Sequence, residues 1–297
     1  TFFFDKKSYG FETWDEEGED LNVSLAGYPE EEDWILYGPY SDKSLIRNKL
    51  TFDLSNAIGF KASNTKFYNL FINGRTKGLY VLMEKIKRDS NRVDISKNNS
   101  GSVDAGYIIK IDKPTSEDGG CNTGYENAFS IRSNYDANGK QSNDSEIYFI
   151  YHYPKPDDIK EDQKQFIYSV INEFETILAS DNFDDPINGY DKVIDVDSFI
   201  DFFIMNEITK NPDGFRLSTF MNKDTGGKLK MGPIWDFNLA FGNVDYCDGM
   251  NPEGWIYNFN SICPSDIWQV PFWWRRLMES PDFKNKLKDR WQALRLN

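Results

Sequence analysis

Hydrophobic and polar residues alternate along much of the first third of the chain, which is the pattern of β-strands with one buried face. The segment KKSYGFE at 6–12 alternates in this way, and other segments nearby are rich in β-branched and aromatic residues. We expect strands at 6–12, 34–40, 65–72, 78–84 and 103–111. Asn73 and Gly74 lie between two of these strands, and Asn-Gly favours a tight hairpin turn.

Later segments repeat their hydrophobic residues every three to four positions, as amphipathic helices do. We expect helices at 41–58, 159–178, 197–206, 268–278 and 281–296, one more strand at 147–154, and a long polar loop at 112–140. Ser41 is a suitable N-cap for the first helix, and Asp157 with Asp158 for the second. This order indicates an α+β fold of two lobes, a strand-rich lobe at 1–112 and a mainly helical lobe at 113–297.

The net charge of the chain limits its partners. Its 297 residues carry 34 Lys and Arg against 48 Asp and Glu, a formal charge of −14. Such a charge disfavours nucleic acid and anionic membranes as partners. No apolar run reaches the ~20 residues of a membrane span. The chain begins at Thr1 without Met, so we expect a fragment from which targeting signals have been lost.

Cysteine and histidine are scarce, which limits the possible chemistry. Cys247 and Cys263 flank a polar loop that a disulfide would close, and we expect this pair to be joined with Cys121 free. A disulfide would suit an oxidising compartment, and three reduced thiols are the other interpretation of the same residues. The single His, His152, ends an aromatic strand, where a packing role is expected. A zinc site or a histidine-based nucleophile is therefore disfavoured.

The segment from Asn206 to Asn243 carries the strongest chemical signal. Asp213 stands in an Asn-Pro-Asp-Gly turn, and a predicted hairpin of 217–222 and 228–232 follows it. The second strand of this hairpin leads to Asp236, which lies between Trp235 and Phe237. Because a hairpin brings its two ends together, we expect both carboxylates to share one cleft.

Two carboxylates in one cleft suit phosphoryl transfer. Asp213 would orient the attacking hydroxyl and Asp236 would hold Mg²⁺ on the phosphates, in the order that protein kinases use. Asn238 or Asn211 would offer a further oxygen ligand. Two other interpretations exist for the same pair: both Asp residues cap backbone groups, or they are the acid and nucleophile of a glycoside hydrolase.

Several short sequence words extend this signal over nearly the whole chain. In the central segment they are NE at 206–207, KNPD at 210–213, Arg216, STFM at 218–221 and GPIWDFNLAFGN at 232–243. Elsewhere they are KKSYGFE at 6–12, WILYGPYSDKSLIRNKL at 34–50, INGRTKGLYVLMEKIKR at 72–88, GYIIKID at 106–112, HYPK at 152–155 and PFWWRRL at 271–277. Together these words resemble the CotH kinase family, which is named for a spore coat protein and found in many secreted bacterial proteins.

The resemblance implies a secreted atypical kinase that uses ATP with Mg²⁺ or Mn²⁺ to phosphorylate Ser or Thr hydroxyls of a protein. It places a phosphate-facing lysine in the KKSY word, and we expect Lys7, which shares a strand face with Tyr9. Lys110 is a second lysine for the phosphates, and Glu84 lies where a kinase hinge would touch the nucleotide. The lobe at 1–112 shows no Gly-rich phosphate loop.

The chain departs from the kinase pattern at two positions. The helix expected at 41–58 has no Glu to pair with a strand lysine, and Ser218 stands five residues after Asp213, where kinases have Asn. The alternative function is therefore a non-catalytic extracellular module that keeps the fold for adhesion or binding. Aromatic residues make up 16% of the chain and would serve such a role.

Overall fold

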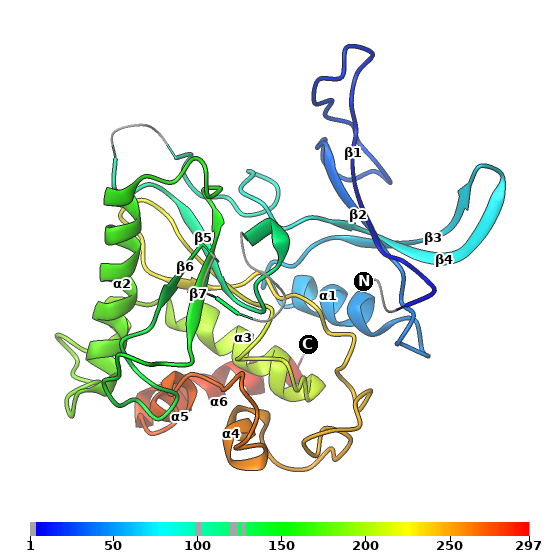
Figure 1. Cartoon of the computed structure of the whole chain (residues 1–297). Coiled ribbons are helices and arrows are strands. Elements are labelled where there is room, and N and C mark those ends of the chain that lie inside the picture. The colour runs from blue at the N-terminus through cyan, green and yellow to red at the C-terminus, as the bar shows by residue number, and fades with distance from the viewer. Residues whose placement is uncertain (1–3, 99–101, 119–123, 126–128, 297) are drawn as a thin grey trace.

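The computed structural model describes residues 4–98, 102–118, 124–125 and 129–296, and Cys121 lies outside these ranges. The described part is a mixed α/β fold with two antiparallel sheets and six α-helices (Figure 1). Short 3₁₀ turns occupy Ser116–Asp118, Tyr190–Lys192 and Ile256–Asn258. Within the described residues, no helix combines the length and apolarity that crossing a bilayer requires.

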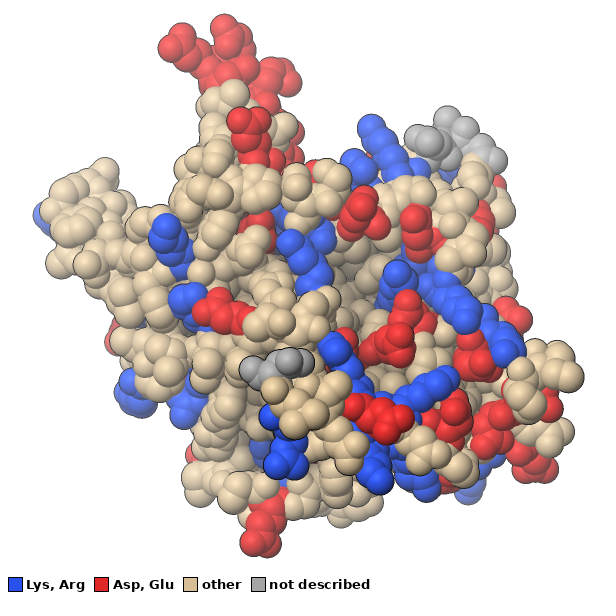
Figure 2. Space-filling view, turned by 180° about the vertical axis from the view of Figure 1, so that it is seen from behind, with Lys and Arg blue, Asp and Glu red and all other residues tan. Residues whose placement is uncertain are grey.

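The first sheet has the strand order β1-β2-β4-β3. Its strands are β1 (Tyr9–Glu12), β2 (Asp33–Tyr37), β3 (Thr65–Ile72) and β4 (Arg75–Glu84), close to the predicted ranges. Asn73 and Gly74 have φ values of 50° and 73°, which confirms the predicted hairpin turn. The connection between β1 and β2 projects from the body as an arm (Figure 1). Acidic side chains gather at the tip of this arm, where solvent covers residues 15–20 (Figure 2).

Helix α1 (Arg47–Ala57) packs beside the first sheet and begins later than predicted. Leu45 has a φ of 65°, a left-handed conformation that breaks any helix before it. Asp42 forms a side-chain turn with the Ser44 N–H at 3.0 Å and accepts the Arg47 N–H at 2.9 Å. The prediction of Ser41 as the N-cap was therefore wrong, because the neighbouring Asp42 satisfies the first turn.

The second sheet has the order β6-β7-β5-β8-β9. Its strands are β5 (Tyr107–Ile111), β6 (Ser130–Arg132), β7 (Tyr148–Tyr153), β8 (Thr219–Lys223) and β9 (Lys230–Met231). The central strand β5 comes from the range expected in the first lobe, yet both of its partners come from later in the chain. The sheets therefore divide the chain before β5, and the register of β5 with β8 pairs Ile111 with Thr219.

The remaining helices are α2 (Glu161–Ala179), α3 (Val196–Thr209), α4 (Phe259–Ile262), α5 (Trp273–Leu277) and α6 (Pro281–Arg295). Helix α3 packs on β9 of the second sheet, α6 packs on α3, and α5 packs on α2. Asp158 lies in a turn before α2, in which its own N–H bonds to Lys155 O at 2.9 Å. The N-cap of α2 is Lys160, so the prediction of Asp157 and Asp158 as caps was wrong. The helix predicted at 268–278 shortens to α5, because Val270 precedes Pro271 and its N–H bonds to Asn260 Oδ1 at 2.7 Å.

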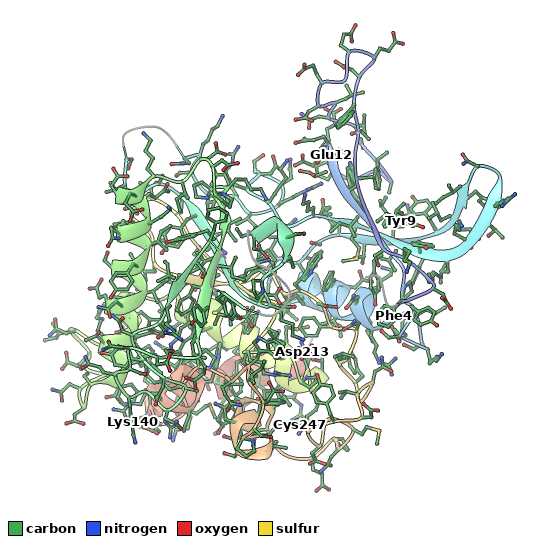
Figure 3. The ribbon with its side chains drawn as sticks, viewed as in Figure 1. Phe4, Tyr9, Glu12, Lys140, Asp213 and Cys247 are labelled. Atoms are coloured by element: carbon green, nitrogen blue, oxygen red, sulfur yellow. A yellow bond between two sulfur atoms is a disulfide. The ribbon has the colours of Figure 1, made fainter. Side chains whose placement is uncertain are left out.

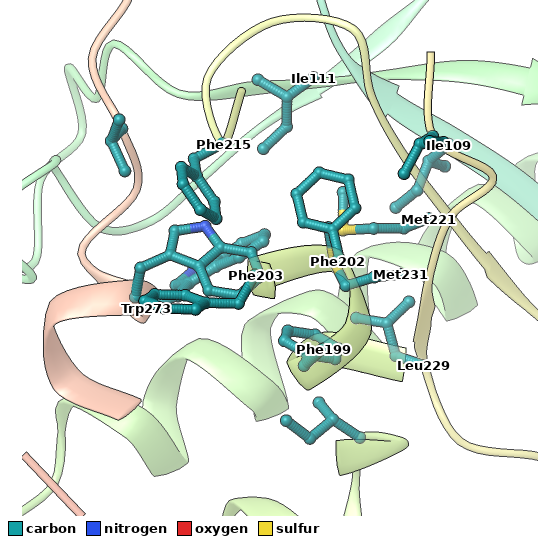
Figure 4. Close-up of a cluster of buried hydrophobic side chains, with 14 of the residues drawn as sticks. Ile109, Ile111, Phe199, Phe202, Phe203, Phe215, Met221, Leu229, Met231 and Trp273 are labelled. Atoms are coloured by element: carbon teal, nitrogen blue, oxygen red, sulfur yellow. The ribbon is translucent and has the colours of Figure 1, made fainter. Parts of the chain in front are cut away.

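Helix α3 forms the centre of the core. Figure 4 shows its Phe199, Phe202 and Phe203 beside Phe215 and Trp273. Phe215 follows the helix in the chain and packs back against Trp274, with ring centroids 4.7 Å apart and the ring planes tilted by 57°. This packing fixes the loop that leaves α3, and Asp213 lies on that loop.

A buried carboxyl group, Glu175 of α2, lies inside this core. It accepts the Trp273 Nε1–H at 3.0 Å and lies 2.7 Å from Ser133 Oγ. Ser133 Oγ also lies 2.9 Å from Tyr135 O, and a serine has only one proton to donate. A protonated Glu175 resolves this competition, since it can donate to Ser133. Burial raises the pKa of Glu175 to about 7.

We predict that Glu175→Gln flattens the pH dependence of stability. The folded pKa of about 7 exceeds the ordinary value of 4.5. The stabilisation of the fold by protonated Glu175 is therefore complete below pH 4.5, and it is lost as the pH rises from there through 7. At pH 8 the variant should be more stable than the unmodified chain by about 3 kcal/mol, measured by urea unfolding. Equal unfolding midpoints at pH 8 would contradict the assignment. The exposed Glu173→Gln on the same helix is the control.

Candidate functional site

The loop from Lys210 to Ser218 carries Asp213, which is labelled in Figure 3. Lys210 ends α3 with a φ of 50°, and a Cβ at Gly214 would lie only 2.2 Å from Asn206 Oδ1. Asn211 donates to Asn206 Oδ1 at 3.1 Å and accepts the Asp213 N–H at 3.3 Å. Asn211, a predicted metal ligand, thus uses its amide to shape this turn.

The carboxylate of Asp213 is held in one orientation. Its Oδ1 accepts hydrogen bonds from Arg216 Nη2 at 2.9 Å and from the Tyr246 hydroxyl at 3.1 Å. Arg216 is buried, pairs also with Asp266 at 3.2 Å, and lies over the Phe259 ring. No described residue forms a hydrogen bond with the other oxygen of Asp213, Oδ2.

Asp236 is positioned by helix α1. Its backbone is left-handed, with a φ of 55°, and the next residue, Phe237, donates its N–H to Asn48 Oδ1 of α1 at 2.6 Å. The Phe237 ring is buried edge-on against Phe52 of the same helix. These contacts turn the backbone so that Asp236 lines a cavity between α1 and the first sheet.

A third carboxylate, Asp112, lies near the predicted pair. It follows β5 directly, and it accepts the N–H groups of Lys113, at 2.8 Å, and of Ser218. Burial raises its pKa. Burial, followed by the negative charges of Asp213 and Asp112, raises the pKa of Asp236 to about 7. The structure thus places Asp112 and Asp213 close enough to Asp236 for their negative charges to act on it.

The sequence analysis did not identify Asp112 or its neighbour Lys113 as site residues. The positive charge of Lys113 opposes part of the rise in the pKa of Asp236. The available signal was the buried strand GYIIK followed at once by Asp112. A carboxylate at the end of a buried strand is held by rigid structure, as a binding group needs to be.

The cavity beside Asp236 has a volume of about 230 Å³. Its walls include Tyr37, Tyr40, Trp235, Asn48 and Asn238. Burial and the charge of Asp236 raise the pKa of the Tyr37 hydroxyl. Small-molecule sites usually exceed ~300 Å³, so the cavity has room for a group the size of a nucleobase and not for a whole nucleotide.

The three residues predicted to contact the nucleotide lie outside the walls of this cavity. Lys110 of β5 is buried in an ion pair with Asp118 at 3.1 Å. Glu84 of β4 is buried and accepts the Asn64 N–H at 2.8 Å. Lys7 precedes β1, where its carbonyl accepts the Tyr80 hydroxyl at 2.9 Å. None of the three lines the cavity beside Asp236.

The donor set around Asp236 suits a hard divalent cation. Mg²⁺ and Mn²⁺ prefer carboxylate and amide oxygens, which Asp236, Asp112 and Asn238 carry. A cation among these groups would relieve the repulsion that raises the pKa of Asp236. The Asn238 N–H bonds to the Asp236 carboxylate, so the two residues already act as one unit.

The predicted disulfide is confirmed and supports the site. Cys247 and Cys263 are joined, with their Cα atoms 5.5 Å apart. Tyr246, which donates to Asp213, immediately precedes Cys247, so the disulfide ties this loop to the end of α4 (Figure 3).

His152 packs against Phe220 and bonds to Ile86 O at 2.8 Å, and burial lowers its pKa to about 4.

Comparison with known proteins identifies a family. The family model described as CotH kinase protein matches residues 1–297, the whole chain. A search of curated proteins found no match.

The contact between α1 and Phe237 gives a testable prediction. Asn48→Ala removes the acceptor of a buried N–H, so we expect a loss of stability of about 1–3 kcal/mol. Asp53→Ala on the same helix removes the exposed partner of the Lys49 ion pair and should cost less than about 0.5 kcal/mol. Urea unfolding measures both, and equal midpoints for the two variants would show that the contact carries little energy.

Proposed function

The chain belongs to the CotH kinase family, and from this premise we propose that it is an atypical protein kinase. In this proposal it transfers the γ-phosphate of ATP to a Ser or Thr hydroxyl of a protein, with Mg²⁺ or Mn²⁺, in a two-lobed kinase-like fold. The observation that carries the proposal is that the charges of Asp112 and Asp213 both repel that of Asp236, a repulsion that a cation would relieve.

Asp236 is the proposed metal ligand, together with the amide oxygen of Asn238. Both line the same cavity, and Asn48 fixes the backbone that carries them. A bound Mg²⁺ or Mn²⁺ would neutralise negative charge on the phosphates. Asp112 is proposed as a further ligand, whereas Asn211 would first have to give up its hydrogen bonds inside the turn.

Asp213 is the proposed catalytic residue. Arg216 and Tyr246 both bind its Oδ1, which leaves Oδ2 to accept the proton of an acceptor hydroxyl. A carboxylate held by two donors keeps one direction without the cost of ordering it during the reaction. The ion pair of Asp213 with Arg216, 2.9 Å long, offsets part of the repulsion between Asp213 and Asp236.

The phosphates need positive charge, and Lys113 is the proposed source because its charge already acts on Asp236. Contacts of Lys7, Lys110 and Glu84 with the nucleotide stay predictions. Lys110 would have to leave Asp118 to make such a contact. We further propose that the protein works outside the cell, since disulfides persist in oxidising compartments.

A second candidate function is a non-catalytic binding or adhesion module with the same fold. The small cavity favours it, because about 230 Å³ is too little for a whole nucleotide without movement of its aromatic walls. Lys110 and Glu84, each engaged inside the fold, favour it as well. The two candidates differ in whether a nucleotide binds.

Nucleotide binding separates the two candidates. For a kinase, ATP with Mg²⁺ at ~100 times its dissociation constant should stabilise the fold by about 2.7 kcal/mol, measured as a shift in thermal unfolding. ATP with chelator is the control and should shift it far less, because the carboxylates repel the unscreened phosphates. If neither Mg²⁺ nor Mn²⁺ produces a shift with ATP, the binding module becomes the better account.

Two substitutions test the proposed roles. Asp213→Ala should lower phosphate transfer by roughly 10²–10⁴-fold while ATP affinity stays within a few-fold, since Asp213 acts on the acceptor. Asp236→Asn should abolish transfer and weaken metal-dependent ATP binding. Asp245→Ala, an exposed carboxylate of the same region, is the matched control. Normal transfer by Asp213→Ala, assayed with radiolabelled ATP, would remove the residue from the mechanism.

A further inference from the structure

A second cavity lies apart from the three carboxylates, between helices α3 and α6 and the loop at Gly254 and Trp255. Its volume is about 450 Å³, larger than that of the cavity beside Asp236. We call it the α3–α6 groove. Its walls expose large apolar side chains, with Ile208 45%, Trp255 51% and Trp291 40% exposed. Three such side chains around one concave surface mark a binding site more than they mark ordinary surface.

Helix α6 turns a mixed face toward this groove. Its lining residues are Lys284, Leu287, Lys288 and Trp291, which follow the spacing i, i+3, i+4 and i+7 of one helical face. Leu287 and Trp291 are apolar, whereas Lys284 and Lys288 are exposed cations. The groove therefore offers apolar contact and positive charge side by side.

The positive charge of the groove is not neutralised by the fold. Neither Lys284 nor Lys288 forms an ion pair with a carboxylate in the described part of the chain. The one acid of the groove, Glu207, already accepts the N–H groups of Ile256 at 2.9 Å and Tyr257 at 2.8 Å. On a chain with a net charge of −14, two unpaired lysines at an apolar groove select an anionic partner.

We propose that the α3–α6 groove binds a protein segment that carries a bulky apolar side chain next to acidic residues. The apolar side chain would pack between Trp255 and Trp291, and the acidic residues would pair with Lys284 and Lys288. Two helices that form the walls of an apolar groove are a common receptor for such segments, and Trp and Met are enriched where proteins meet. Met278 lines the same groove. The proposal does not depend on phosphate transfer.

The test uses a fluorescein-labelled twelve-residue peptide with one Trp and one Leu three positions apart and Glu at most other positions. Fluorescence anisotropy with the whole chain measures its binding. We expect binding that weakens at least about tenfold when the Glu residues become Lys, and likewise when Trp and Leu become Ser. Raising the salt from about 50 to about 500 mM should weaken the binding, because exposed ion pairs are screened.

Variants of the chain locate the binding. Lys284→Glu with Lys288→Glu should weaken it at least about tenfold, and Ile208→Asp should do the same. Lys286→Glu with Arg295→Glu makes the same charge change on α6 outside the groove and should leave binding within about twofold. Circular dichroism and thermal unfolding check that each variant is folded.

Two outcomes would overturn the proposal. Equal weakening by the groove variant and by its control would show that binding follows overall charge alone. Binding of dodecanoate, with no binding of any peptide, would assign the groove to a lipid-like anion and not to a protein segment.

Discussion

The hydrogen bond from the Phe237 N–H to Asn48 Oδ1 is the contact on which the arrangement of the site depends. It joins helix α1, which packs on the first sheet, to the segment that leaves the second sheet after β9. Arg47 strengthens the same junction by donating to Ala240 O at 3.0 Å, and Phe52 covers it with apolar surface. Because these groups are buried, loss of one partner would leave an unpaired polar group, so the junction has one stable geometry. Asp236 directly precedes Phe237 in the chain, so this junction also fixes the position of Asp236.

Repulsion between carboxylates acts against this fixed arrangement. The charges of Asp112 and Asp213 both repel that of Asp236, and the packed elements hold these groups together against that repulsion. Arg216 relieves part of it through Asp213, and Lys113 relieves part of it at Asp236. Folding thus brings negative charges together around Asp236 and neutralises only part of them. A buried carboxylate whose charge is opposed in this way marks a candidate binding site for a cation.

Most strands and the long helices were predicted because their apolar period is a local property, as in β3, β4, α2 and α6. The predicted starts of helices were wrong where a neighbouring side chain bonds to the N–H groups of the first turn, as Asp42 does before α1. Asp213 and Asp236 lie in one continuous segment, so their proximity was predictable, and so was the disulfide that closes a short loop. Asp112 was missed because only the pairing of β5 with β8 brings it near them. Lys110 and Glu84 were chosen from their order in the chain, which gives no information about Asp118 or the Asn64 N–H as partners.

Strand β5 sits at the centre of the second sheet although it precedes its partners β7 and β8 by long stretches of chain. Its pairing must therefore wait until distant segments meet, which favours slow folding. A fragment that begins after Ile111 would keep β7 and β8 but would expose two unpaired apolar edges where β5 had been. Open edges of this kind pair with other molecules and drive aggregation. Proteolytic removal of the first part of the chain would thus release insoluble material, and not an independent helical half.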